Sequence, residues 1–341
     1  MGFGGKCEIG MITLFTIKQK KSAREYDVKD LVTDVSWVTD LGFSAGTLNF
    51  SLFVGQHSEL IPRNGDEIEF CWDNKKVFKG RIFKCTVDDK ERYKILAYDN
   101  LRYLKNEDTI VFPVSTGTER FERIMNTLQL PYRSLNLMVA NLEAKVCDGE
   151  TYFSMLQDAV EQSNRITKDG EFFVRCNYDV VEIVQATDLR RTTLLLDEDT
   201  TLTGWNLEYS ADDLYNVVKV TQESGEDKER KTFTVGQAEA QDSIAQYGQL
   251  TKVERADKDM NIAQMENKAR QLLDELNREK TTLSFTSTGV LDVRAGQRFF
   301  IATKQGLLKE RELIADKVTH NFGTTWSMDV QVRILGLGRT M

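Results

Sequence analysis

The sequence contains little of what disulfide frameworks, zinc sites and most catalytic sites require. Its 341 residues include two histidines, three prolines and five cysteines, and no two cysteines are spaced as CxxC. An odd number of cysteines without a Cys/His cluster argues against a disulfide framework and against a local zinc site. We therefore expect Cys7, Cys71, Cys85, Cys147 and Cys176 to be reduced and mostly buried thiols, which fits synthesis in a cytosol.

Long hydrophobic runs are also missing. The apolar stretch GMITLFTI at 10–17 follows Glu8 and is followed by KQKKSA, so it matches neither a signal peptide nor a membrane helix. It predicts a first β-strand instead. The start MGFGGK lacks the Ser or Thr of a myristoylation signal. We therefore expect no membrane insertion.

Basic residues are not in excess. The chain has 45 Lys and Arg against 53 Asp and Glu, which gives a net charge of −8 at pH 7. Proteins that bind nucleic acid neutralise its phosphates with clustered Lys and Arg. In this chain, short basic runs such as KQKK at 18–21 are flanked by acidic stretches. These runs are typical of solvated faces. The sequence therefore predicts no specific nucleic-acid binding.

What is present indicates a folded chain of several domains. Its length suggests about two to four domains, and 40% hydrophobic with 29% charged residues is typical of a compact fold. From residue 8 to about 112, short β-rich runs are separated by turn signals, among them Asp73-Asn74. We predict a first domain at 1–112, a small β-barrel or sandwich.

The segment 113–203 has helical as well as strand patterns, and it predicts a separate α+β insert. Thr116 and Glu119 form a capping-box pattern, and the helix that follows should end at Pro131. Its buried face should consist of Phe121, Ile124, Met125 and Leu128. A second helix near 150–164 and two strands around an Asn177-Tyr178-Asp179 turn complete the insert.

Strands return in the segment 204–341, together with a long helix from about 258 to 279. The apolar stripe of this helix covers one face, so the helix should lie against other elements; it consists of Ile262, Met265, Ala269, Leu272, Leu273 and Leu276. The strand WSMDVQVRIL alternates most clearly, with Trp326, Met328, Val330, Val332 and Ile334 on the core face and Ser327, Asp329, Gln331 and Arg333 on the polar face.

Two short segments more than two hundred positions apart resemble each other. TLNFS at 47–51 is followed by RNGDEIEF at 63–70, and TLSFT at 282–286 is followed by RAGQRFFI at 294–301. Two hypotheses are open, a coincidence between unrelated hairpins and a duplicated module.

The order of elements favours duplication. In both places a strand and a loop lead to a glycine, Gly65 or Gly296, which opens a second strand, and a turn, a third strand and a closing strand follow. A match across four successive elements predicts two similar β units in one chain. Phe50 and Phe285 should then occupy equivalent positions.

Histidine-based catalysis has little support. His57 lies in a predicted loop and His320 near a strand end, and no Ser or Cys motif accompanies either, so we expect both to be surface residues. GxSxG, HExxH, P-loop and EF-hand patterns are absent. We predict no catalytic, cofactor-binding or metal-binding residues and no enzymatic activity.

Clustered carboxylates are better explained as solvated turns than as a glycosidase pair, because sequence neighbours seldom face each other across a cleft. The clusters are Asp66, Glu67 and Glu69; Asp197, Glu198 and Asp199; and Asp212 and Asp213. Asp99 and Arg102 resemble a catalytic pair, but an Asp at a strand end that caps the next turn is the simpler interpretation.

Several segments resemble the baseplate hub proteins of contractile phage tails. They are KILAYDNLRYLKNED at 94–108, ADDLYNVVKVTQESG at 211–225, IAQYGQLTKVERADKD at 244–259 and VRAGQRFFI at 293–301. The likeness is greatest to the hub of PBSX-type prophages and of related phage-tail-like bacteriocins. It covers nearly the whole chain, and the hub part of type VI secretion spike proteins looks similar.

The resemblance implies a mainly β, α+β fold in which two tail-tube-like β-barrel domains, 1–112 and 204–341, bracket the insert. It implies a homotrimer that forms a pseudo-hexameric ring in a virion or phage-tail-like particle assembled in the host cytoplasm. The implied partners are a tail-tube or tube-initiator protein, a separate spike protein, other baseplate proteins and a tape-measure protein. Two alternatives stay open, a tail-associated peptidoglycan hydrolase and a carbohydrate-binding tail protein, each using the insert.

Overall fold

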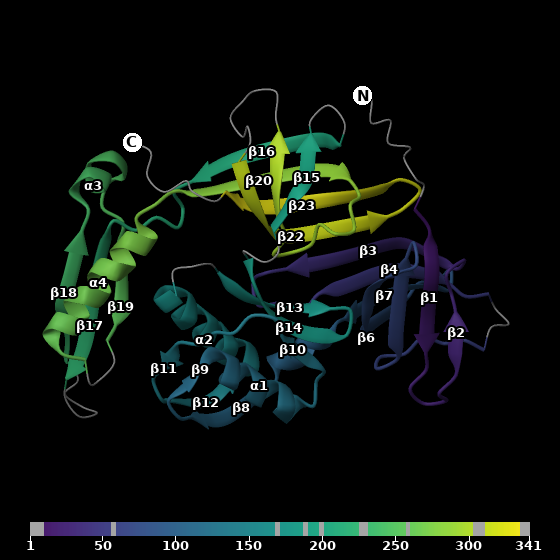
Figure 1. The fold of residues 1–341 in the computed structure, drawn as a ribbon, viewed down its shortest axis with the longest axis horizontal. Helices are drawn as coiled ribbons and strands as arrows, with labels where there is room; N and C mark the ends of the chain where they lie inside the picture. The colour runs from purple at the N-terminus through teal and green to yellow at the C-terminus, as the bar shows by residue number, and fades with distance from the viewer. Residues whose placement is uncertain are drawn as a thin grey trace. The chain divides into compact units, whose positions relative to one another are not determined.

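The computed structural model describes residues 10–55, 59–167, 171–186, 190–197, 201–224, 231–256, 260–302 and 311–334. Two compact units are present, one formed by Met1–Asn206 with Leu283–Met341 and the other by Leu207–Thr282. Strands predominate over helices in both the element order and the ribbon (Figure 1). The predicted α+β, mainly β class is therefore confirmed.

The N-terminal part of the large unit is an antiparallel sheet. Its strands are β1 (Ile12–Lys18), β2 (Glu25–Asp27), β3 (Val32–Asp40), β4 (Thr47–Phe53), β5 (Glu67–Trp72), β6 (Lys75–Val87) and β7 (Arg92–Tyr98). They lie in the order β3-β4-β7-β6-β5-β1-β2. Asp73 and Asn74 connect β5 to β6 with φ angles of 49° and 60°, as the predicted tight turn requires.

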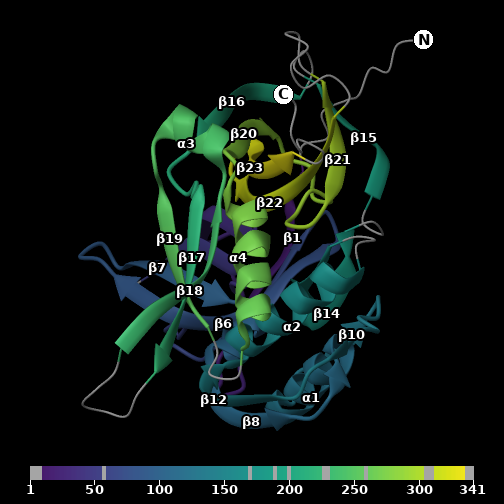
Figure 2. The same ribbon diagram turned by 90° about the vertical axis from the view of Figure 1, so that its left-hand side faces the viewer.

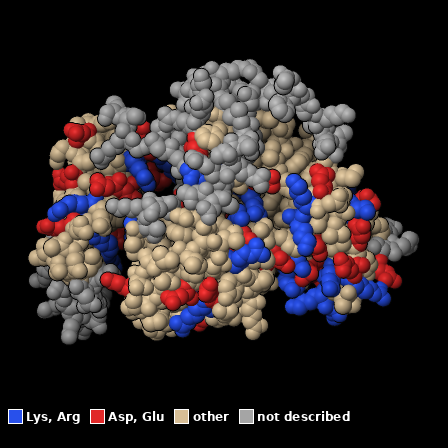
Figure 3. All heavy atoms as spheres, in the orientation of Figure 1, with Lys and Arg blue, Asp and Glu red and all other residues tan. Residues whose placement is uncertain are grey.

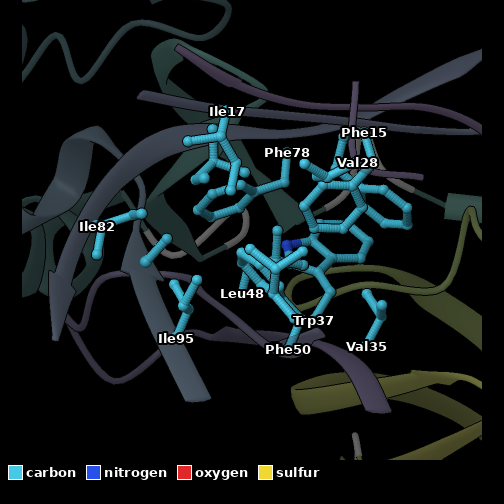
Figure 4. Packing of buried hydrophobic residues seen from close by; sticks show 14 of the residues in the cluster. Phe15, Ile17, Val28, Val35, Trp37, Leu48, Phe50, Phe78, Ile82 and Ile95 are labelled. Atoms are coloured by element: carbon cyan, nitrogen blue, oxygen red, sulfur yellow. The ribbon is translucent and has the colours of Figure 1, made fainter. Parts of the chain in front are cut away.

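The core of this sheet is rich in aromatic side chains (Figure 4). The rings of Phe15 and Phe50 meet edge to face with centroids 4.7 Å apart, and the ring of Phe70 lies 5.3 Å from Phe15. Fully burying side chains of this size contributes roughly 2–3 kcal/mol each. The β1, β4 and β5 strands are thus held together by their inward-facing residues.

The insert combines two helices with short strands. Its elements are η1 (Asn100–Lys105), β8 (Glu107–Phe112), β9 (Ser115–Thr116), α1 (Gly117–Leu128), β10 (Tyr132–Ser134), β11 (Asn141–Leu142), β12 (Lys145–Thr151), α2 (Tyr152–Thr167), β13 (Phe172–Asn177) and β14 (Val180–Gln185). β8 pairs with β12, β9 with β11, and β10 with the β13–β14 hairpin.

The local signals of the insert were predicted correctly. Thr116 and Glu119 form the capping box of α1, and Phe121, Ile124 and Met125 on its inner face are fully buried. Tyr178, with φ of 62°, forms the turn between β13 and β14. The core of the insert also includes Leu101 and Leu104 of η1, which precede the predicted boundary at 113.

The C-terminal part of the large unit adds a second set of strands to the same sheet. These strands are β15 (Arg190–Asp197), β16 (Leu202–Ser210), β20 (Lys280–Thr288), β21 (Arg298–Ala302), β22 (Arg311–Phe322) and β23 (Trp326–Ile334). β22 pairs antiparallel with β3 of the first set, from Lys317–Asp40 to Phe322–Val35. Within the described ranges the strand order is an open path from β16 to β2, so this structure shows no closed barrel.

The small unit has its own sheet and core. β17 (Val217–Ser224) lies between β18 (Lys231–Glu239) and β19 (Thr251–Arg255), and α3 (Gln241–Tyr247) and α4 (Ile262–Leu276) complete the unit. Figure 2 shows α4 lying along this sheet. Met265 and Ala269 of α4 are buried against β17 and β18. Ile262, predicted to belong to the apolar stripe, is the first residue of α4 and is exposed, whereas the later residues of the stripe pack into the core of this unit.

The compact units do not coincide with the three ranges 1–112, 113–203 and 204–341. The long helix, expected beside the strands of a second barrel, packs on the small sheet of the 207–282 unit. The division into two tube-like domains, 1–112 and 204–341, and an insert at 113–203 stays a prediction.

Candidate functional site: a duplicated sheet with one polar face

The sheet of the large unit contains the same strand arrangement twice. The first repeat, β1, β3, β4, β5, β6 and β7, lies in the order β3-β4-β7-β6-β5-β1. The second repeat, β15, β16, β20, β21, β22 and β23, lies in the order β16-β20-β23-β22-β21-β15. Numbered along the chain, both orders are 2-3-6-5-4-1. The two repeats differ at the last of these pairings, because β1 runs antiparallel to β5 whereas β15 runs parallel to β21.

The segments TLNFS and TLSFT occupy the same place in this arrangement, β4 and β20. Phe50 and Phe285 are both buried, and each contacts another core phenylalanine edge to face: Phe15 at 4.7 Å and Phe299 at 5.9 Å. The equivalent positions expected for Phe50 and Phe285 are therefore observed in the strand order.

The glycine turns of the two repeats make the same hydrogen bonds. Gly65 donates its N–H to the carbonyl of Ile82, and Gly296 donates to the carbonyl of Ala315, both at 2.8 Å. The φ angles of Gly65 and Gly296 are 93° and 86°, a region that favours glycine. The hydrogen bonds of this turn repeat together with its amino-acid sequence. The turn is therefore a shared structural element and not a chance similarity.

A β-bulge also recurs at the same place. The register between β6 and β7 shifts between Ile82 and Lys84, and the register between β22 and β23 shifts between Ala315 and Lys317. A bulge adds one residue to one strand and bends it, so its repetition gives both repeats the same local bend. Duplication explains the order, the turn and the bulge together.

One face of the continuous sheet is polar over the four adjacent strands β23, β22, β3 and β4, at the junction of the two repeats. Cross-strand partners share a face, so the registers place the following residues together: Ser327, Asp329 and Gln331 of β23; Lys317, Thr319 and Asn321 of β22; Ser36, Val38 and Asp40 of β3; and Thr47 and Asn49 of β4. The alternate residues of these strands form the buried core. We call this surface the polar face.

The polar face carries little net charge. Lys317 Nζ lies 3.7 Å from a carboxylate oxygen of Asp40. Asp329 accepts hydrogen bonds from Thr286 Oγ1 at 2.8 Å and from Asn321 Nδ2 at 3.0 Å. A groove of about 420 Å³ crosses the face over β16, β20, β22 and β23, and Trp205 lines one side of it. Hydroxyl and amide groups therefore dominate this surface.

His320 lies in the core at the seam between the repeats, and the prediction of a surface histidine was wrong. It is fully buried because β22 pairs with β3 there, which places its ring against Trp37 with centroids 5.4 Å apart. Its Nε2 lies 2.7 Å from the carbonyl oxygen of Val293. Burial lowers the pKa of His320 to about 4. A neutral, packed imidazole without a nucleophile beside it is a structural residue.

A cluster of charged side chains joins the second repeat to the insert. Arg175 donates two hydrogen bonds to one oxygen of the buried Glu182, and Arg294 Nη1 donates to Asn177 Oδ1 at 3.0 Å. Burial lowers the pKa of Arg294 to about 10. Sequence reasoning missed Arg294, although it occupies the place of Arg63 in the repeated segment. The hydrogen bond from Arg294 to Asn177 connects the second repeat to the insert, so we interpret this cluster as structural.

Asp99 caps a turn, as predicted, and forms no catalytic pair with Arg102. Its two oxygens accept hydrogen bonds from the backbone N–H groups of Leu101 and Gly46, each at 3.0 Å. Burial raises the pKa of Asp99 to about 7. Arg102 instead lies over the ring of Phe83, 5.1 Å from its centroid.

Asp66 was wrongly expected to be solvated. It is buried because both of its oxygens accept backbone hydrogen bonds, from Lys20 at 3.0 Å and Arg63 at 2.9 Å. Asp212 and Asp213 are exposed, as predicted. His57, Cys7 and the side chains of the 197–199 cluster lie outside what the structure describes.

No metal-binding arrangement is found in the part of the chain that the structure describes. No three His, Cys, Asp or Glu side chains gather there as metal ligands would. The four described cysteines are free thiols, two of them buried. Among the described helices, none has the length and apolar character to cross a membrane.

The fold is that of phage tail proteins. The 43 kDa tail protein of prophage MuSo2 from Shewanella oneidensis superposes with a TM-score of 0.68 at 10% identity, over 94% of this chain and 98% of that chain. The E. coli c3393 protein, a type VI secretion component with structural similarity to the T4 tail proteins gp27 and gp5, has a TM-score of 0.54 at 12% identity, over 90% of this chain and 74% of that chain. At such identities these likenesses establish the fold alone.

The family follows from sequence comparison. The YQBQ-like family model matches residues 35–333, and the chain belongs to this family. It is 26% identical over 340 residues to YqbQ of Bacillus subtilis (strain 168), covering 94% of this chain and 96% of the relative. It is 26% identical over 292 residues to XkdQ of the phage-like element PBSX of the same strain, covering 82% and 84%. The resemblance to PBSX-type proteins is thereby confirmed.

Proposed function

We propose that the chain is the structural baseplate hub of a contractile tail or phage-tail-like particle. The observation that carries the proposal is the duplicated sheet, with one strand order, one glycine turn and one bulge occurring twice. Three copies would place six similar repeats about a threefold axis. Such a ring meets a sixfold tail tube on one side and a threefold spike on the other, and so adapts one symmetry to the other.

The polar face supports a role as the wall of the central channel. A wall that lets DNA or a tape-measure protein pass must not hold it, and clustered charge of either sign would attract counter-charged groups. Hydroxyl and amide groups, one ion pair and a single further carboxylate, Asp329, which accepts hydrogen bonds from Thr286 and Asn321, meet this requirement. The channel wall proposed here is therefore close to neutral, although the whole chain has a net charge of −8.

The proposed partners are a tube or tube-initiator protein, a separate spike protein, other baseplate proteins and a tape-measure protein. The likeness of fold to a type VI secretion component that resembles gp27 and gp5 supports this setting. The hub would act through assembly and shape, without turnover, because the chemistry-bearing residues Asp99, Asp66 and His320 are committed to structural contacts.

Electron microscopy of the purified chain, with mass measurement in solution, tests the proposal. We expect a ring of three chains with six similar lobes and a central hole. A chain that stays monomeric alone and with its tail partners, or one that clears a peptidoglycan suspension, would contradict the hub and support the hydrolase alternative.

A further inference from the structure

The seam between the two repeats shows how one repeat of this sheet binds another. The first part of β22, Arg311–Ile314, pairs with β21, and its second part, Lys317–Phe322, pairs antiparallel with Val35–Asp40 of β3. Both neighbours lie on the same edge of β22, because β23 occupies the opposite edge along both parts. Figure 1 shows β22 beside β3. A strand that extends beyond its neighbour thus provides the edge on which the other repeat pairs.

β6 is the counterpart of β22, and the second part of its edge is uncovered. Lys75–Arg81 pairs with β5, whereas Lys84–Val87 pairs with β7 alone among the strands that the structure describes. Both second parts follow the repeated β-bulge, so Thr86 occupies the place of Thr319. Unpaired backbone N–H and C=O groups along such an edge form a template for another strand.

β16 is the counterpart of β3, and its outer edge is uncovered too. Each is the second strand of its repeat, but β3 lies between β4 and β22, whereas β16 pairs with β20 and ends the path of the described sheet. A large hydrophobic side chain is exposed on each uncovered edge, Val87 of β6 at 54% and Tyr209 of β16 at 60%. Figure 3 shows charged side chains of both signs over the first repeat, so binding through a strand edge suits this repeat better than binding through an apolar face on the side shown.

Two hydrogen bonds set the register of β16 on β20. Thr288 donates its N–H to the carbonyl of Thr201 at 3.0 Å, and Thr203 Oγ1 donates to the carbonyl of Thr286 at 3.1 Å. The residue number rises on one strand as it falls on the other, so the two strands are antiparallel. Continued along the strand, this register places Leu207 opposite the first residue of the segment TLSFT.

The register identifies matching positions on the two uncovered edges. Val38 of β3 lies opposite Thr47, the first residue of TLNFS, so Val38 and Leu207 are counterparts. Val38 is also the partner of Thr319 across the seam. Because Thr86 is the counterpart of Thr319, the structure that covers β22 within the chain also shows which strand fits the edge of β6.

We propose that the second part of β6 in one copy pairs antiparallel with β16 of the next copy, as β22 pairs with β3 within the chain. The inference rests on the proposed ring and names the strands that close it. Each copy offers one edge of either kind, so the contacts run head to tail and close when the rotation between copies fits. The pairing places Thr86 opposite Leu207, and it places Lys84 opposite Tyr209, where the ammonium group lies over the exposed ring.

Cysteine pairs across the contact test the proposal. Opposed residues of antiparallel strands have Cα atoms roughly 4.5–5.5 Å apart, a distance that a disulfide spans. Under oxidation we therefore expect T86C/L207C to form covalent trimers on a non-reducing gel. An equimolar mixture of T86C and L207C should give covalent dimers, and each single variant should keep the mass of one chain.

Two further pairs serve as controls. T86C/N206C is the matched control, because Asn206 points to the opposite face of β16 from Leu207, and it should not form covalent trimers. V38C/T319C should form the equivalent disulfide inside one chain, which keeps the mass of one chain and removes two free thiols. Wild-type melting of T86C/L207C under reducing conditions shows that this variant is folded.

A trimeric ring in which T86C/L207C forms no more disulfide than T86C/N206C would overturn the contact and leave the ring intact. A wild-type chain that stays monomeric, alone and with its tail partners, would remove both the ring and the contact.

Discussion

Among single residues, three buried ionisable side chains show most clearly how the fold holds polar groups in its core. His320, Asp99 and Asp66 each lie in the core, and each is held by backbone groups. Burial raises the pKa of Asp99 to about 7 and lowers that of His320 to about 4. Both shifts disfavour the charged form, so both couple folding to pH.

His320 predicts an acid-sensitive stability. Its folded pKa lies below the usual 6.5, so its contribution is present above about pH 6.5 and is lost as the pH falls toward 4. Between about pH 7 and pH 4.5 the wild type should lose roughly 2 kcal/mol more free energy of unfolding than H320Q, whose amide keeps a donor for Val293. Denaturant unfolding at both pH values measures the difference.

The comparison isolates His320 because Asp99 is the same in both proteins. The raised pKa of Asp99 acts with the opposite sign, since its contribution is lost as the pH rises toward 7. Equal losses of stability for the wild type and H320Q on acidification would contradict a desolvated imidazole at the seam.

At the scale of elements, the repeated glycine turn has different surroundings in the two repeats. A methyl group at Gly296 would lie 2.1 Å from the ring of Phe173, whereas a methyl group at Gly65 would meet nothing closer than Lys20 Cδ at 3.9 Å. The duplicated turn has thus become a packing site for the insert in the second repeat only.

The two turns form a matched pair of substitutions. Both G65A and G296A place a side chain at positive φ, which costs about 1 kcal/mol. G296A must also displace the Phe173 ring, which adds roughly 1–3 kcal/mol. Thermal unfolding of both variants measures the difference, and equal destabilisation would show that Phe173 does not press on this turn.

At the scale of the whole molecule, the 207–282 unit is inserted between two neighbouring strands of the large sheet. β16 ends at Ser210, β20 begins at Lys280, and the two strands are adjacent. The unit between them has its own core around Met265 and Ala269. Neighbouring strands can be joined by a short connection, so the large sheet does not require this unit for its continuity.

Removal of the inserted unit tests this independence. We expect a chain in which a short Gly/Ser linker replaces 211–279 to keep the large unit folded, with a Tm within about 5 °C of the wild type. Circular dichroism during heating and limited proteolysis monitor the outcome. A chain that loses its cooperative transition would show that the two compact units depend on each other for folding.

The sequence by itself determined the local elements, because their signals act over a few residues. The capping box of Thr116, the Asp73-Asn74 turn, the alternation in β23 and the repeated glycine segment all depend on side-chain period, turn geometry or internal similarity. The duplicated strand order was predicted in outline for the same reason.

Only the tertiary structure decided how these elements combine. Pairing of β22 with β3 makes one continuous sheet of the two repeats, buries His320 against Trp37 and aligns the polar face. The uncovered edge of β6 likewise follows from the register of β6 with β5, which ends at Arg81. Such pairings join residues far apart in the chain, and the free energy of burial that selects them is not encoded in any local pattern.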